Sequence, residues 1–225
     1  MPVSRRQTES AQTCRDHRPK TQGEQHMNCR IKPVGFVRGL LVILAATAFT
    51  RLSISGEKKD QSAAFGKPVK TFQLKDVVSD KTVRMTDYKG RVLVLGWYSP
   101  GCITCPMYDA RLKKFAAQHL KAKKVSLLII SSNSMDSPAK LRAYAKQKKF
   151  NFPVLRDGDA SLAKYYGIDQ TCTFVVIDSR GRMQFRGGFD DDRDADTVEH
   201  HYVEDSVKAV LAGTKLKIRQ SDVLG

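Results

Sequence analysis

Two cysteines separated by two residues, Cys102 and Cys105, have the spacing in this chain that most clearly indicates chemistry. At the start of a helix, residues three apart share a face, so both thiols can come within disulfide range. The helix N-terminus favours an anion, which would lower the pKa of Cys102 and make it a reactive thiolate. The pair therefore predicts redox chemistry, with metal binding as the alternative because zinc uses the same spacing.

An apolar run, a turn and a helix are expected to hold this pair. Residues 92–95 are all apolar, which is typical of a short buried strand, and Ser-Pro-Gly at 99–101 predicts a turn after it. Apolar residues then recur at helical spacing as far as about residue 119. We therefore expect the helix to begin at Cys102, where the turn ends.

Strand and helix patterns alternate along the rest of the chain. A nearly continuous apolar run at 125–131 is typical of a central strand covered on both faces, and Ser137-Pro138 favours a helix start. The order indicates an α/β protein whose mixed central β-sheet is flanked by helices and carries an N-terminal β extension. We expect strands at 72–74, 83–85, 91–96, 125–131, 153–155, 173–178 and 183–186, and helices at 102–119, 138–149, 161–166 and 197–211.

The first 51 residues differ from the remainder. The uncharged stretch at 39–50 (GLLVILAATAFT) lies between Arg38 and Arg51 and is too short for a typical transmembrane helix. With basic residues before it and Ala-Thr-Ala at 46–48, it matches the apolar region of a secretory signal. We expect residues 1–51 to hold an upstream extension and a signal or anchor segment, with the true start at Met27.

This segment predicts export to the periplasm or another extracytoplasmic compartment. The alternatives are an uncleaved membrane anchor or a buried helix of the fold. A linker at 52–64, a folded domain at 65–213 and a C-terminal tail at 214–225 complete the expected organisation. Cleavage would remove Cys14 and Cys29 and leave three cysteines, an odd and small number that does not suit a disulfide-stapled scaffold.

The 225-residue chain has a formal net charge of +16. Lysines cluster within 121–124 and 146–149, near the expected helix ends, and no aromatic platform or groove motif accompanies them. We interpret them as solvated helix ends and expect no nucleic-acid partner, with attraction to an acidic partner or a membrane surface as the alternative. Membrane contact is expected only through the N-terminal segment, if it stays uncleaved.

Residues 65–211 resemble the thioredoxin-fold redoxins. This group includes alkyl hydroperoxide reductase/thiol-specific antioxidant proteins and periplasmic thioredoxin-like oxidoreductases. The resemblance rests on SPGC with its C-x-x-C motif, on FPVLRD at 152–157 and on TFVVIDSRGRMQFRG at 173–187. It implies a thioredoxin-like fold and an antioxidant or thiol–disulfide exchange activity.

In the mechanism that this resemblance implies, Cys102 attacks a substrate disulfide and Cys105 resolves the mixed disulfide. The implied substrates are protein disulfides or dithiols, small-molecule thiols and peroxides, and a thiol reductant partner supplies electrons. No organic cofactor and no metal ion is expected. The residues expected to line the site are Trp97, Tyr98, Ser99, Pro100, Thr171 and Cys172.

Three departures from the family pattern stand out. Residues 103–104 are Ile-Thr instead of the Gly-Pro of thioredoxin itself, so its redox potential does not carry over. The buried acid of thioredoxin has no counterpart in the strand at 91–96. The family usually has a cis-proline just before the strand at 173–178, and this loop carries Cys172 instead, so a third sulfur is expected near Cys102. Three roles stay open for Cys172: a redox thiol, a soft-metal ligand or a small buried residue.

A thiol peroxidase is the first competing function. Ser99 and Cys102 resemble a Thr-x-x-Cys motif in which Cys102 would become a sulfenic acid. Against this interpretation, Leu95 replaces that family's proline and Thr171 replaces its arginine.

Soft-metal binding is the second competing function. Cys102 and Cys105 could bind copper together with Cys172 or a histidine of the pair His200-His201. The acidic loop at 190–196 is interpreted as solvated, with calcium binding as its alternative.

Overall fold

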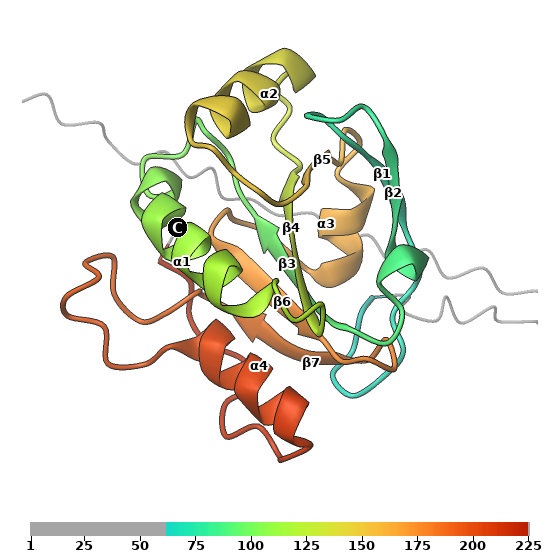
Figure 1. The fold of residues 1–225 in the computed structure, drawn as a ribbon, viewed down its shortest axis with the longest axis vertical. Helices are drawn as coiled ribbons and strands as arrows, with labels where there is room; N and C mark the ends of the chain where they lie inside the picture. Colours follow the sequence, from blue (N-terminus) through green and yellow to red (C-terminus); the bar gives the residue numbers. More distant parts are fainter. Residues whose placement is uncertain (1–61, 225) are drawn as a thin grey trace, which may run out of the picture. The chain divides into compact units, whose positions relative to one another are not determined.

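The computed structural model describes residues 62–224, which form one mixed β-sheet with helices on both faces (Figure 1). The expected signal or anchor segment, the proposed start at Met27 and the linker up to residue 61 lie outside the described residues. No helix within 62–224 combines the length and the apolar character that a membrane span needs. The strands are β1 (Gln73–Asp76), β2 (Thr82–Arg84), β3 (Val92–Trp97), β4 (Val125–Ser131), β5 (Val154–Arg156), β6 (Thr173–Ile177) and β7 (Met183–Gly187).

The sheet has the strand order β2-β1-β5-β4-β3-β6-β7. The three middle strands β5, β4 and β3 are parallel, and β6 joins β3 antiparallel, with Leu95 paired to Leu128 on one side and to Val175 on the other. The β1–β2 hairpin adds to the β5 edge, and β6–β7 forms the other edge. The predicted mixed sheet with its N-terminal β extension is confirmed.

Strands β3 and β4 are buried along their whole length, as expected of strands covered on both faces. We call one face the cysteine face: its core includes Cys105 and Cys172, and it is covered by α1 (Asp109–His119), α2 (Pro138–Gln147) and α4 (Tyr202–Ala212). We call the other the packing face: it is covered by α3 (Ser161–Tyr166) and by side chains from residues 63–74. Figure 1 shows α1 and α4 on the same side of the molecule, where His119 and Glu204 connect them at 2.7 Å.

The helix after β3 begins later than the sequence predicts. It starts at Cys105 with the 3-10 turn η2 (Cys105–Tyr108) and continues as α1, so Cys102 precedes the helix. The Cys102 N–H donates to the Ser99 carbonyl at 3.1 Å, which closes a turn instead of a helix. Pro106 lies in the first turn of η2, where its missing N–H costs nothing, and this places the helix start.

The last helix is also shorter than predicted, because α4 starts at Tyr202 and not at residue 197. The Asp191 carboxylate accepts the N–H groups of Glu199 and His200 at 3.0 and 2.9 Å, which holds this segment as a loop. The first residue of the acidic loop is not solvated either: Asp190 is buried and paired with Arg111 at 2.6 Å.

Candidate functional site

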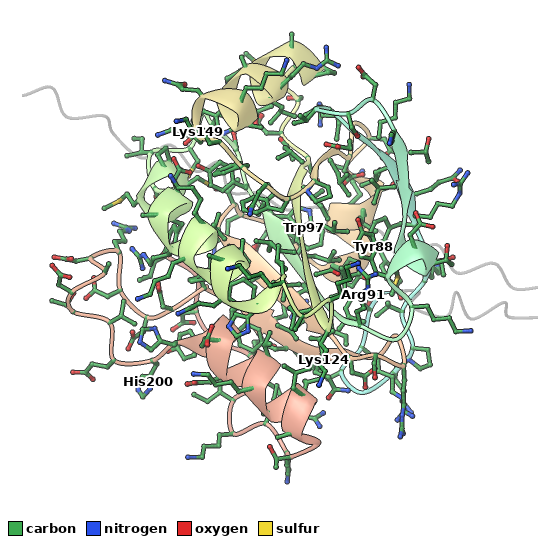
Figure 2. All side chains as sticks on the ribbon, viewed as in Figure 1. Tyr88, Arg91, Trp97, Lys124, Lys149 and His200 are labelled. Atoms are coloured by element: carbon green, nitrogen blue, oxygen red, sulfur yellow. The ribbon has the colours of Figure 1, made fainter. Side chains whose placement is uncertain are left out.

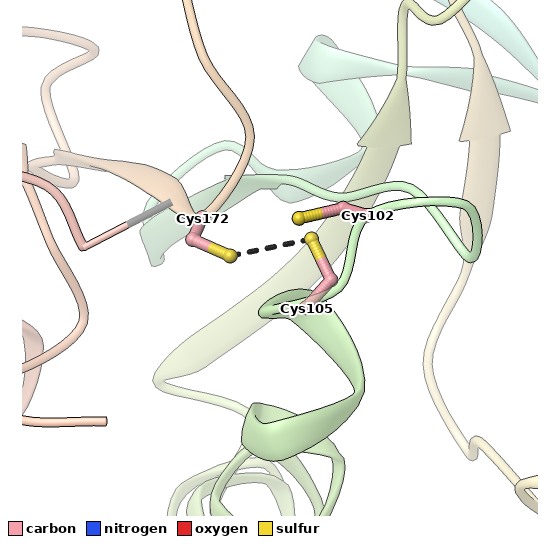
Figure 3. Close-up of side chains that lie close together, drawn as sticks. All are labelled: Cys102, Cys105 and Cys172. Atoms are coloured by element: carbon pink, nitrogen blue, oxygen red, sulfur yellow. Dashed lines mark hydrogen bonds between the residues drawn. The ribbon is translucent and has the colours of Figure 1, made fainter. Parts of the chain in front are cut away.

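Three cysteine sulfurs meet at one end of the central strands (Figure 3). Cys102 lies in the turn after β3 and is partly exposed, whereas Cys105 at the start of η2 and Cys172 just before β6 are buried. The Cys105 and Cys172 sulfurs are 3.2 Å apart, and all three sulfurs lie within 4.8 Å of one another. The expectation that a third sulfur would lie near Cys102 is confirmed.

Ser99 organises the turn that carries Cys102. Its N–H donates to the Cys105 sulfur at 3.4 Å, and its hydroxyl accepts from the Gly101 N–H at 3.1 Å. The Asn133 side-chain amide donates to the same hydroxyl at 3.0 Å, which ties the turn to the segment after β4. Ser99 itself is buried, and its hydrogen bonds hold the turn next to the sulfurs.

The electrostatics of the buried pair favour a thiolate on Cys105. A hydrogen bond from Cys172 lowers the pKa of Cys105 to about 6, with help from the Ser99 N–H and against the effect of burial. The pKa of Cys172 is raised, first by its hydrogen bond to Cys105 and then by burial. We conclude that the Cys172 thiol keeps its proton and donates it to the Cys105 thiolate.

This distribution differs from the sequence expectation. The lowered pKa was expected at Cys102, at a helix N-terminus, but the helix begins at Cys105 and the lowered pKa belongs to that residue. Helix geometry therefore does not single out Cys102. What distinguishes Cys102 is its exposure, since the other two sulfurs are buried.

Cys172 is held by the sheet. Its N–H donates to the Trp97 carbonyl at 2.7 Å, next to the pairing of Trp97 with Thr173 between β3 and β6. Its φ of +62° is in the left-handed region, uncommon for a residue with a side chain. The preceding Thr171 lowers the pKa of Cys105 further, after the larger effects of Cys172 and the Ser99 N–H. The loop before β6 thus brings both Thr171 and Cys172 to the sulfurs.

Trp97 and Tyr98 point to opposite faces of the sheet, as successive strand residues do. Trp97 packs against Tyr166 on the packing face with ring centroids 5.5 Å apart, so its side chain belongs to the core. Tyr98 lies on the cysteine face, where its hydroxyl donates to the Asp109 carboxylate at 2.5 Å. Both residues also line a surface pocket of about 260 Å³ together with Thr171.

Asp109 is the buried residue that sequence reasoning missed. It comes from the first turn of α1 and not from the strand at 91–96, where a buried acid was sought. Its carboxylate accepts from Tyr98, from Tyr144 at 2.8 Å and from Lys148 at 2.9 Å. An acid four residues after Cys105, between apolar core positions of a helix, is the signal that could have found it. Lys148 is thus an ion-pair partner, whereas it was interpreted as a solvated helix end.

The rim of the site is apolar and open. Ile103 stands between the two motif cysteines with 94% of its surface exposed, and Met107 is 49% exposed. The histidine considered as an extra metal ligand is elsewhere: His200 is grouped with Asp191 and Glu199. Figure 2 shows His200 at the edge of the molecule, well away from Trp97 at the end of β3.

The chain is similar to known redox proteins. The AhpC/TSA family matches residues 65–186. The thiol-disulfide oxidoreductase ResA of Bacillus subtilis is 24% identical over 144 residues, which cover 64% of this chain and 78% of ResA. The thiol:disulfide interchange protein DsbE of Xylella fastidiosa is 27% identical over 152 residues, which cover 66% of this chain and 74% of DsbE.

The fold has a counterpart among solved structures. An uncharacterized conserved protein from Geobacillus kaustophilus superposes with a TM-score of 0.63 at 24% identity, covering 71% of this chain and 88% of that one. The fold is thioredoxin-like, as the sequence resemblance implied.

Proposed function

The chain belongs to the AhpC/TSA family, and on this premise we propose that it is an exported thiol–disulfide oxidoreductase acting through Cys102 and Cys105. The similarity to ResA and DsbE supports the reaction class. The observation that carries the assignment to these residues is the contrast in exposure. Cys102 is accessible from outside, and the buried Cys105 sulfur lies within 4.8 Å of it.

Exchange begins when the Cys102 thiolate attacks one sulfur of a substrate disulfide. The bond between the two substrate sulfurs breaks, one substrate thiolate leaves, and Cys102 is held in a mixed disulfide. The Cys105 thiolate then attacks the Cys102 sulfur and releases the second substrate thiolate. The substrate is reduced by two electrons, and the enzyme is left with a Cys102–Cys105 disulfide. The reverse sequence oxidises a dithiol.

The surroundings of Cys105 suit the second step. A thiol attacks best when its pKa is close to the ambient pH, because a lower value reduces its nucleophilicity and a higher value leaves too little thiolate. The hydrogen bonds from Cys172 and from the Ser99 N–H place the pKa of Cys105 at about 6. The resolving thiol is therefore ionised at neutral pH without being over-stabilised.

The test is disulfide reduction by the purified full chain with dithiothreitol as electron donor and insulin as substrate. We expect Cys102→Ser to reduce insulin only at the uncatalysed rate. Pre-reduced Cys105→Ser, mixed with insulin after the dithiothreitol has been removed, should accumulate a mixed disulfide at Cys102. Cys29→Ser is the matched control, because it removes a thiol outside the motif and should keep full activity. Wild-type turnover in Cys102→Ser would refute the assignment.

The direction of exchange follows from the reduction potential of the Cys102–Cys105 couple. A value of about −270 mV would make the protein a reductant, and a value of about −120 mV would make it an oxidant. Equilibration with glutathione buffers, followed by counting of free thiols, measures it. The same variants test the peroxidase alternative, because Cys105→Ser would still consume one equivalent of peroxide if Cys102 were a peroxidatic thiol.

Export rests on the signal-like segment before residue 52. It is tested by fractionating cells that produce the full chain. We expect the protein outside the cytoplasm, either shortened near residue 48 or retained in the membrane fraction. Full-length protein recovered only from the cytoplasm would refute export and leave the exchange assignment standing.

A second candidate function is binding of a soft metal ion, because all three sulfurs lie within 4.8 Å of one another. Three thiolates suit Cu(I), which favours sulfur ligands. Titration of the reduced full chain with Cu(I) against a competing chelator tests it. One tightly bound equivalent that is lost in Cys172→Ala would support this function, and equal binding by Cys172→Ala would refute the three-sulfur site.

A further inference from the structure

The catalytic pair leaves one close sulfur unused. Cys172 does not belong to the C-x-x-C motif, yet its sulfur lies 3.2 Å from that of Cys105. We propose that Cys105 is shared by two alternative disulfides, Cys102–Cys105 and Cys105–Cys172, which interconvert inside the oxidised protein. This inference rests on the proposed function and adds a second redox state to the same site.

The geometry requires little movement. A disulfide bond is about 2.05 Å long, so the two buried sulfurs are roughly 1 Å farther apart than a bond would hold them. Cys172 is fixed by its N–H bond to the Trp97 carbonyl, and Cys105 by the Ser99 N–H on its sulfur. Both sulfurs are therefore held next to each other from two different segments of the chain (Figure 3).

The internal exchange balances without any other reactant. Cys172 loses its proton, its thiolate attacks the Cys105 sulfur, and a Cys105–Cys172 bond forms as the Cys102–Cys105 bond breaks. Cys102 leaves as a thiolate and takes up a proton. One disulfide and one thiol are present before and after, so no oxidant is consumed and no net electrons are transferred.

Oxidation itself prepares Cys172 for this step. In the reduced protein, the thiolate of Cys105 is the first cause of the raised pKa of Cys172. That thiolate no longer exists once Cys105 is bonded to Cys102. The pKa of Cys172 then falls toward its ordinary value, and burial is the only effect that still raises it. The Cys172 thiolate therefore forms more readily than in the reduced protein.

The consequence for function is a change from two working thiols to one. With Cys105 bonded to Cys172, the partly exposed Cys102 thiol is free again but has no resolving partner. A mixed disulfide formed at Cys102 in this state would persist, because nothing inside the site displaces it. The internal disulfide therefore turns an exchanger into a carrier of a bound thiol compound.

The two disulfides can be told apart after trypsin digestion. Cys102 and Cys105 fall in one peptide, residues 92–111, and Cys172 falls in another, residues 165–180. The full chain is oxidised with oxidised glutathione, quenched in acid, blocked with N-ethylmaleimide and digested without reduction. We expect two products in mass spectrometry: peptide 92–111 with an internal disulfide, and peptide 92–111 linked to 165–180 with maleimide on Cys102.

Two variants sharpen the result. In Cys102→Ser, all disulfide within the domain should be the link between the two peptides, whereas Cys172→Ala should show only the internal disulfide of 92–111. The proposal is overturned if wild type forms that internal disulfide but no linked peptide. Failure of the proposed function looks different, because then wild type would form no Cys102–Cys105 disulfide at all. Wild type alone gives both answers, so a variant that fails to fold does not block the test.

Discussion

The two faces of the sheet bury polar groups in different ways. On the cysteine face, buried or half-buried polar groups bond to one another: Asp109 accepts from Tyr98 and Tyr144, and the sulfurs of Cys105 and Cys172 are paired. On the packing face, the buried Asp157 accepts the backbone N–H groups of residues 162 and 163 at the start of α3. A carboxylate bonded to backbone N–H groups fixes a helix, whereas linked titratable side chains can exchange protons. The packing face therefore holds the fold together, whereas the cysteine face carries the groups that can react.

Tyr166→Ala should disrupt only the packing face and should cause the largest loss of stability. The Tyr166 ring is fully buried against Trp97, and truncating a buried aromatic side chain costs about 3–5 kcal/mol. We expect urea denaturation to show this loss while the reduction potential of the cysteine pair stays unchanged. Tyr166→Phe is the control: the hydroxyl has no hydrogen-bond partner within residues 62–224, so its removal should cost almost nothing. A shifted potential in Tyr166→Ala would contradict the division between the faces.

Tyr98→Phe should affect both stability and chemistry. The Tyr98 hydroxyl donates to a buried carboxylate, and losing a hydrogen bond to a charged group costs about 1.5–3 kcal/mol. Without this hydrogen bond the negative charge of the Asp109 carboxylate is less screened. Because a nearby negative charge disfavours a thiolate, we also expect the pKa of Cys105 to rise. Thiolate absorbance at 240 nm as a function of pH measures that shift. Tyr144→Phe, which removes a half-buried donor to the same carboxylate, should show smaller changes. If stability falls but the pKa of Cys105 does not change, the Asp109 carboxylate has no influence on the redox site.

The most gradual expected effect is a pH dependence specific to the reduced protein, because it is spread over the interval between two pKa values. The folded pKa of Cys105 is about 6, and a thiol in an unfolded chain titrates near about 8.5. Between these values the unfolded chain binds one more proton, so stability rises with pH by at most about 1.4 kcal/mol per unit. This contribution is complete above about pH 8.5 and is lost as the pH falls through 6.

Urea midpoints of the reduced protein between pH 6 and 8 test this slope. Above about pH 8.5 the raised pKa of Cys172 acts in the opposite direction, because the unfolded chain then loses a proton that the folded protein keeps. Reduced Cys105→Ala and the oxidised wild type should lack the contribution. Equal slopes in all three proteins would show that the buried pair carries no thiolate.

The order of strands and helices could be predicted because its signals are local. The apolar runs of β3 and β4 and the Ser137-Pro138 start of α2 are readable residue by residue. The helix start at Cys105 was missed because a turn at Ser99 and a proline at 106 outweigh the helical pattern before them. Both errors in helix starts come from side chains or turns that take backbone N–H groups away from the helix.

The site could be predicted only in part because it is assembled from distant segments. The C-x-x-C motif is local, and Cys172 was expected nearby only through a family resemblance that implies β6 next to β3. The carboxylate network was not foreseen, because Asp109 meets Tyr98 and Lys148 only after α1 and α2 have packed on the same face. Long-range partners of this kind have no periodicity in the sequence.

The hydrogen bond from the Cys172 N–H to the Trp97 carbonyl continues the pairing of β6 with β3. The position of the third sulfur is therefore fixed by the register of the sheet. Position 172 can therefore change identity without moving the motif cysteines, whose turn is built from Ser99 and Asn133. One codon therefore adds or deletes the proposed second disulfide, and the same change removes the largest cause of the lowered pKa of Cys105.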